Sequence, residues 1–196
     1  MIDLREVSRS VFGAWMLARF NPDGLLLFEN TVSAFWRSYW AAILALPAFI
    51  ALVMMFAPEI PVAVGHLSAI IIRTSGYVAG WFLLPFIMFY VCRLIDREEQ
   101  FCRYIAAYNW ARLLQILLLL LVTILSASGV IPKNISPFVT FAAYVFVLIY
   151  QGFIVRVALM IPGIGAFGIV VMDLATGIVI EICTGRLLAG QSMFGG

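Results

Sequence analysis

Charged side chains are scarce in this 196-residue chain, and they are unevenly distributed. They make up 11% of the residues, whereas an average soluble domain has about 25%. Five stretches contain no Asp, Glu, Lys or Arg: 38–58, 74–92, 113–132, 134–155 and 157–172. Each is close to the roughly 20 residues that a helix needs to cross the hydrocarbon core of a bilayer. The scarcity of charge therefore excludes a soluble enzyme, a disordered chain and a nucleic-acid-binding protein.

Residue types that carry catalysis and metal binding are also few. The chain has one histidine and three cysteines, and no cysteine pair has the spacing of a metal site. No H-E-x-x-H motif, no P-loop and no serine nucleophile with a partner histidine is recognisable. Residues 163–168 spell G-x-G-x-x-G, but a dinucleotide site needs a preceding strand, and here a membrane helix is expected. We therefore expect no enzymatic activity, no metal and no cofactor.

Hydrophobic residues, in contrast, make up 64% of the chain. They predict an all-α, polytopic membrane helix bundle with about five transmembrane helices. The bundle is expected to occupy 39–185, with spans at 39–57, 74–93, 112–131, 138–158 and 163–183 and a short tail at 186–196. Residues 62–72 are apolar but too few to cross alone. They predict either an interfacial turn of helix or an extension of the second span.

Residues 1–38 predict a cytoplasmic or interfacial amphipathic region before the bundle. Apolar residues recur at three- and four-residue spacing over 3–20, and the turn residues at 21–24 end that helix. A second amphipathic helix is predicted over 25–37. Such helices lie in the headgroup plane or pack against the protein's own spans, and the pattern fits both arrangements equally well.

The distribution of basic residues predicts the orientation in the membrane. Nine arginines fall on one side of the predicted spans, and only Arg73, Lys133 and Arg186 fall on the other. Because basic residues are enriched in cytoplasmic segments, we expect a protein of the cell inner membrane with a cytoplasmic N-terminus and a periplasmic C-terminus. One cytoplasmic segment combines basic and aromatic residues and is expected to anchor to headgroups or contact a partner. Its basic residues are Arg93, Arg97, Arg103 and Arg112.

Asp173 is the single acidic residue at the centre of a predicted span. A charge at that depth costs at least about 2.5–3.5 kcal/mol, so such residues normally have a partner. Thr176 and Glu181 follow on the same helix and give it a small, polar face. Three alternative partners for Asp173 are predicted: Gln151, Tyr144 and Arg73. The acid is interpreted either as a proton or ion site, or as a hydrogen-bonded group that fixes helix packing or a subunit contact.

Glycines in two of the spans predict close helix contacts. Gly76 and Gly80 have the G-x-x-x-G spacing that lets helix backbones approach each other. Gly163, Gly165 and Gly168 are expected to act in the same way at the start of the fifth span, or to make that helix start flexible.

The step into the third span, with the sequence QFCRYIAAY at 100–108, follows an N-terminal amphipathic region and lies among closely spaced spans. In these features the chain resembles the Ypt/Rab-interacting-protein (Yip) family, over roughly residues 25–185. The Asp-Leu-Tyr-Gly-Pro motif of the eukaryotic members is missing, and residues 21–25 read Asn-Pro-Asp-Gly-Leu in a comparable place. The resemblance implies a membrane topology, and no functional residue is transferred from it.

Two functions fit this sequence. The leading prediction is a non-enzymatic scaffold, assembly or accessory subunit of a larger inner-membrane complex. The alternative is a small oligomeric transporter or channel that uses Asp173 and Glu181 along an ion or proton path. The expected partners are the lipid bilayer and either other membrane subunits or further copies of the chain, without nucleic acid.

Overall fold

The computed structural model of the chain describes residues 3–56 and 63–190, and every regular element in these ranges is helical. Five helical segments are long and apolar enough to cross a membrane. These are Val32–Met55, which contains α2 (Val32–Ser38) and most of α3 (Trp40–Phe56), then α4 (His66–Leu94), Glu98–Ala127, which contains α5 (Phe101–Ala127), α6 (Ser136–Leu159) and α7 (Gly163–Leu188). The prediction of an all-α, multi-pass membrane bundle is confirmed.

The second and third helices begin well before the predicted spans. The second begins at His66, so the apolar residues that precede the predicted 74–93 span are an extension of it from that residue onward. The third begins at Phe101 rather than at 112, because the charged and aromatic residues before Arg112 continue the helix instead of forming a loop. Arg112 therefore lies well inside a membrane-length helix.

The N-terminal region differs from the prediction in its second part. The first helix, α1 (Leu4–Ala18), is present, and the side chain of Asp3 caps it by accepting a hydrogen bond from the Arg5 amide. The predicted single helix over 25–37 is wrong. Asn21 instead caps a 3₁₀ helix, η1 (Pro22–Leu27), and Thr31 caps the short α2 by accepting from the Ala34 amide. Thr31 is thus a second cap residue, and a new helix begins after an extended link.

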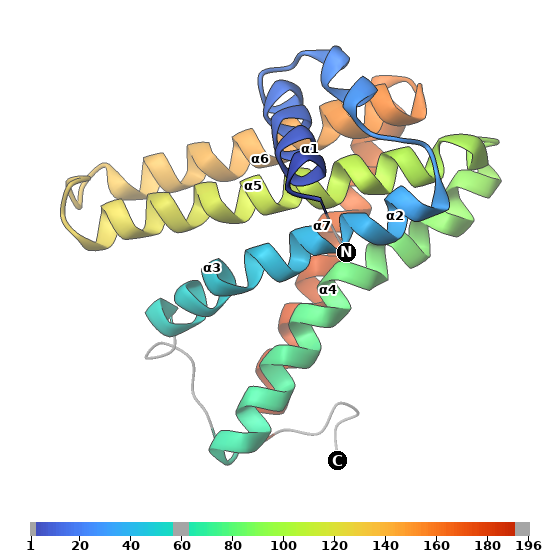
Figure 1. The fold of residues 1–196 in the computed structure, drawn as a ribbon. Coiled ribbons are helices and arrows are strands. Elements are labelled where there is room, and N and C mark those ends of the chain that lie inside the picture. The colour runs from blue at the N-terminus through green and yellow to red at the C-terminus, as the bar shows by residue number, and fades with distance from the viewer. Residues whose placement is uncertain (1–2, 57–62, 191–196) are drawn as a thin grey trace.

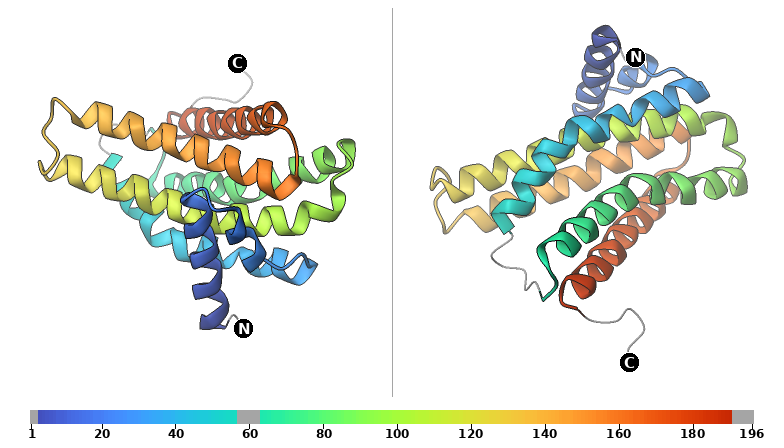
Figure 2. Two further views of the ribbon diagram at one scale, coloured as in Figure 1. Left: turned by 90° about the horizontal axis from the view of Figure 1, so that it is seen from above. Right: turned by 60° about the horizontal axis from the view of Figure 1, so that its bottom comes forward.

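The long helices form two antiparallel pairs that lie close together at one end of the bundle (Figure 1). One pair is α5 and α6, and α3 runs alongside α5; the other pair is α4 and α7. The two pairs diverge away from the shared end, as the second view of Figure 2 also shows. The short 3₁₀ helix η3 (Glu98–Gln100) leads into α5 at this shared end.

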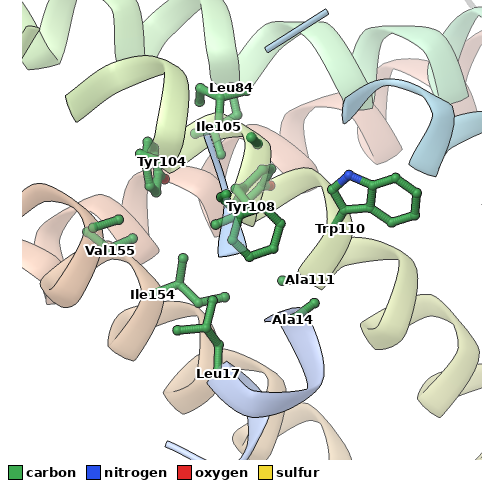
Figure 3. Close-up of a cluster of buried hydrophobic side chains, with 14 of the residues drawn as sticks. Ala14, Leu17, Leu84, Tyr104, Ile105, Tyr108, Trp110, Ala111, Ile154 and Val155 are labelled. Carbon is green, nitrogen blue, oxygen red and sulfur yellow. The ribbon is translucent and has the colours of Figure 1, made fainter. Parts of the chain in front are cut away.

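The N-terminal helix packs on the outside of the α5–α6 pair and crosses both helices steeply (Figure 1). Its buried side is made of small residues and Leu17, and Figure 3 shows Ala14 and Leu17 beside Ala111 of α5 and Ile154 of α6. The Tyr150 hydroxyl on α6 donates a hydrogen bond to the Ala14 carbonyl at 2.7 Å. Its outer side exposes Phe12 and Trp15, so this amphipathic helix packs against the protein and still presents apolar side chains outward.

Large apolar side chains cover the outer faces of the long helices. On α4 the exposed residues include Phe82, Phe86, Phe89 and Tyr90, and on α7 they include Ile164, Phe167, Ile178 and Ile182. A helix bundle in water would bury such residues, whereas in a bilayer they face lipid tails. The surface therefore fits a protein surrounded by lipid.

Candidate functional site: a polar cluster between the long helices

Asp173 lies on α7 and is half-buried against the neighbouring helices. The Tyr108 hydroxyl on α5 is 3.1 Å from both of its carboxylate oxygens and donates to them. The Gln151 side-chain amide on α6 also donates to the carboxylate. The three consecutive helices α5, α6 and α7 thus meet at one acidic group. Of the three partners that the sequence left open, Gln151 is the one that contacts Asp173, whereas Tyr144 is exposed.

Arg112 extends the cluster to a fourth helix. It lies one helical turn after Tyr108 on α5, and its guanidinium donates to the Gly80 carbonyl of α4. The same guanidinium stands over the Trp81 ring, 5.0 Å from the ring centroid, a cation–π contact that is strongest when water is excluded. None of the ion pairs of 4.0 Å or less among the described residues joins Arg112 to Asp173, and Tyr108, one turn before Arg112 on α5, is the residue that bonds to the acid. Arg112 is thus the neighbouring positive charge that accompanies the acid.

Glycine makes the approach of Arg112 possible. A Cβ atom on Gly80 would lie 3.1 Å from the Arg112 Nη2 atom, so a larger residue would push the guanidinium away from the α4 backbone. One turn earlier, a Cβ on Gly76 would lie 2.8 Å from the Thr184 Oγ1 atom of α7. The two glycines of the G-x-x-x-G motif therefore have different neighbours: Gly80 admits Arg112, and Gly76 lets α7 pack against α4.

The cluster lies inside the bundle, a short distance along the helices from their shared end. Tyr108 is seven residues after the start of α5, Gln151 is eight before the end of α6, and Asp173 is ten after the start of α7. At 1.5 Å per residue these positions are about 10–15 Å from the helix ends. That depth is between a third and a half of a hydrocarbon core of roughly 30 Å.

Two buried donors next to the cluster have no partner in the described part of the chain. They are the Tyr104 hydroxyl, one turn before Tyr108 on α5, and the Trp81 indole nitrogen. Both side chains are almost completely buried, and Figure 3 shows Tyr104 and Tyr108 on the same helix within the core. The region around Asp173 therefore has more hydrogen-bond donors than acceptors.

The other predicted polar residues of α7 have separate roles. Thr176 donates from its hydroxyl to the Met172 carbonyl at 2.8 Å, a bond within its own helix. Glu181 is exposed and takes part in none of the hydrogen bonds or ion pairs found among the described residues. The structure brings neither residue into contact with Asp173.

The glycines at the start of α7 have few neighbours. No atom of another element lies within 4 Å of a Cβ built on Gly163 or Gly168, and a Cβ on Gly165 would meet only the preceding Ile161 side chain. Within the described chain these three residues therefore do not form the close helix contacts that the sequence predicted for them. Their surface is open instead.

The four basic residues of the 93–112 segment each have different surroundings. Arg97 donates to the Leu159 carbonyl at 3.0 Å and so joins the end of α4 to the end of α6. Arg93 is exposed, 3.8 Å from Glu98. The Arg103 backbone amide donates to the Asn30 side-chain oxygen at 3.1 Å. Arg112 lies further along α5, where it bonds to α4, and the role of these residues as a cytoplasmic anchor or partner contact stays a prediction.

A group of ion pairs holds the N-terminal region to α2. Arg37 is 2.6 Å from Glu6 of α1 and 3.1 Å from Glu29, and Arg9 of α1 is 2.8 Å from Glu29. The Arg9 guanidinium, through its hydrogen bond, lowers the pKa of the Glu29 carboxyl below the ordinary value of 4.5. Deeper in the same contact, the Asn109 amide of α5 donates to the Ser38 hydroxyl at 2.8 Å. These contacts place α1 and α2 firmly against α5.

No group of three or more His, Cys, Asp or Glu residues that could hold a metal ion occurs within 3–56 and 63–190. The three cysteines are free.

Comparison with known proteins gives no relative. No protein-family description matches the chain, no curated protein is detectably similar to it, and no solved structure resembles it. The similarity to the Yip family stays a prediction.

Proposed function

We propose that the protein is a non-enzymatic scaffold, assembly or accessory subunit of a larger inner-membrane complex. The observation that best supports this proposal is the use of the intramembrane polar groups. Tyr108 and Gln151 donate to Asp173, which joins α5, α6 and α7, and Arg112 of α5 donates to the Gly80 carbonyl of α4. A polar cluster whose members bond to one another is a device for fixing helix packing.

The surface of the protein also supports this proposal. Ion pairs hold the parts of the N-terminal region together, and the Asn109–Ser38 hydrogen bond joins this region to α5. The region presents exposed aromatic residues such as Phe12, Trp15 and Trp36. Aromatic side chains are enriched at membrane interfaces and at the centres of protein contacts. The distribution of arginines favours a cytoplasmic location for this end of the bundle, which fits the topology expected from the Yip resemblance.

The alternative, a small oligomeric transporter or channel, is favoured by one observation. Asp173 and Glu181 lie on the same helix eight residues apart, which corresponds to about 12 Å along the axis. Asp173 is half-buried and Glu181 is exposed. An ion or proton path would need further polar groups between them, and only Thr176, bonded to its own backbone, is a polar side chain in that interval of α7.

Purification from native membranes tests the two functions. In a mild detergent, native mass measurement is expected to show a complex with at least one different membrane protein. The Asp173→Asn variant is expected to lower the yield of this complex, because the substitution weakens the bonds that join the helices. A protein that purifies without any other subunit and conducts ions or protons in liposomes would contradict the scaffold proposal. Normal transport by Asp173→Asn would contradict the transporter alternative.

A further inference from the structure

Glu181 is an exposed carboxylate on a membrane-length helix, and it has no partner among the residues that the structure describes. The side chains around it on the outer face of α7 are apolar, with Ile178 and Ile182 both exposed. A charged group facing lipid is costly, and such residues normally pair with another polar group or face water. The described ranges, 3–56 and 63–190, supply a partner for Asp173 but none for Glu181.

The surface around Glu181 is suited to another helix. Gly177 and Gly185 stand four residues before and after it, on the same side of α7. No atom of another element lies within 4 Å of a Cβ built on either glycine. Small residues on both sides of a polar group let a second helix approach closely and reach that group. The side of α7 that packs on α4 is a different one, marked by Ile180 and Thr184 opposite Gly76.

Two arginines lie at the same end of the α4–α7 pair as Glu181. Arg186 is exposed and five residues further along α7, or about 7.5 Å along the axis. Arg73 is on α4, one turn before the Gly76 that faces Thr184. Neither arginine belongs to an ion pair within the described ranges. This end of the molecule thus carries both members of a charge pair, and neither is paired with another residue of the described ranges.

We propose that α7 is a self-association helix, in which Glu181 of one copy pairs with Arg186 of a second copy across the surface formed by Gly177, Glu181 and Gly185. Copies that insert in the same orientation are related by an axis along the membrane normal, so their α7 helices run parallel at the same depth. The offset between Glu181 and Arg186 is then short enough for the long arginine side chain to bridge. Glu181 and Arg186 lie on different sides of α7, so the contact is head-to-tail.

The experiment uses the purified full-length protein alone, in liposomes, with two differently labelled populations and energy transfer as the measure of association. The unmodified protein is expected to associate. Glu181→Gln and Arg186→Gln are each expected to weaken association about tenfold, the effect of losing one charged pair. Gly177→Leu is expected to weaken it as well, because the leucine occupies the space that the second helix needs.

Gly168→Leu is the matched control, because Gly168 is another exposed glycine of α7 with open space around it; this variant is expected to associate normally. Helix content and thermal stability of each variant show whether a loss of association reflects a loss of folding. A mixture of Glu181→Arg and Arg186→Glu proteins is expected to regain the association that each lacks alone.

Three results would overturn the proposal: a monomeric unmodified protein, an association that Glu181→Gln and Gly177→Leu leave unchanged, or equal weakening by Gly168→Leu. The scaffold function is judged separately, because it depends on a different protein that copurifies from native membranes. Self-association and partner binding can thus fail independently.

Discussion

The pairing of Arg112 with the Asp173 cluster leads to a quantitative prediction. Replacing Arg112 by Met removes a hydrogen bond to the Gly80 carbonyl and the cation–π contact with Trp81, and it leaves the Asp173 carboxylate without its neighbouring positive charge. A hydrogen bond from a charged donor contributes about 1.5–3 kcal/mol in soluble proteins, but side-chain hydrogen bonds between membrane helices average only about 0.6 kcal/mol. A desolvated cation–π contact adds about 2 kcal/mol.

We therefore expect Arg112→Met to lower the free energy of unfolding by about 2–4 kcal/mol. Asp173→Leu is expected to cost a similar amount, since it removes the acceptor for Tyr108 and Gln151 and leaves Arg112 uncompensated. The double variant removes both charges, so the penalty for an isolated charge, which each single variant includes, is absent. Its destabilisation is expected to be smaller than the sum of the two by about 1–3 kcal/mol.

The measurement is reversible unfolding in mixed detergent micelles, followed by circular dichroism, for all four members of the cycle. Arg156→Met is the control, since Arg156 is an exposed arginine near the end of α6, and it is expected to change the free energy by no more than about 0.5 kcal/mol. If the effects of Arg112→Met and Asp173→Leu add to within about 0.5 kcal/mol, Arg112 does not compensate Asp173 and the reasoning is refuted.

Three further predictions concern the packing of α4 against α7 and the contacts that hold α1. Gly76→Val is expected to destabilise the protein by about 1–3 kcal/mol through overpacking against α7, while Gly168→Val, at an open position, changes little; thermal unfolding in detergent measures both, and equal effects would contradict the packing argument. Tyr150→Phe removes the bond to the α1 backbone and is expected to cost about 1 kcal/mol, with faster proteolysis of α1; unchanged cleavage would show that this bond does not hold the helix. Because Arg9 lowers the pKa of Glu29, the stabilising effect of Glu29 is present above its ordinary pKa of 4.5 and is lost as the pH falls through the lowered value. Tryptophan fluorescence is expected to show α1 loosening in acid, and Glu29→Gln to loosen it already at neutral pH; a variant with the unchanged acid transition would refute the role of this pair.

The absence of charge was sufficient to predict the membrane helices, because hydropathy depends on composition over about 20 residues and not on contacts. Hydropathy predicts the wrong start for a helix that contains a charged residue. The predicted third span begins at Arg112, yet the helix begins at Phe101 and continues through Arg112. The identity of the residue alone does not distinguish an arginine that bonds to a neighbouring backbone and packs on an indole ring from an arginine in a loop.

The sequence contains a signal for Tyr108 and Arg112, two members of the cluster that were not among the predicted partners of Asp173. Tyr104, Tyr108, Arg112 and Gln115 recur at three- and four-residue spacing, which predicts a single polar face if the segment is helical. The first three fall within the 93–112 segment that the charge pattern predicts to be cytoplasmic, so the pattern does not predict this face inside the bundle. The link between this face and Asp173 depends on how α5, α6 and α7 pack, and spacing along one helix does not contain that information.

The second N-terminal helix was mispredicted for a local reason. The apolar spacing over 25–37 fits one helix, but Pro22 follows the Asn21 cap to start a 3₁₀ turn, and Thr31 provides a new cap. Capping side chains compete with continued helix by bonding to nearby amides, and here they decided the outcome over the hydrophobic pattern.

The position of Asp173 on the last described helix has a consequence for biosynthesis. The chain is made from the N-terminus, so Tyr108 and Gln151 are synthesised before Asp173, which accepts their hydrogen bonds. Until α7 joins the bundle, α5 and α6 carry these two donors without their shared acceptor. The polar contact among the three helices is therefore completed only when the last of the described helices is in place.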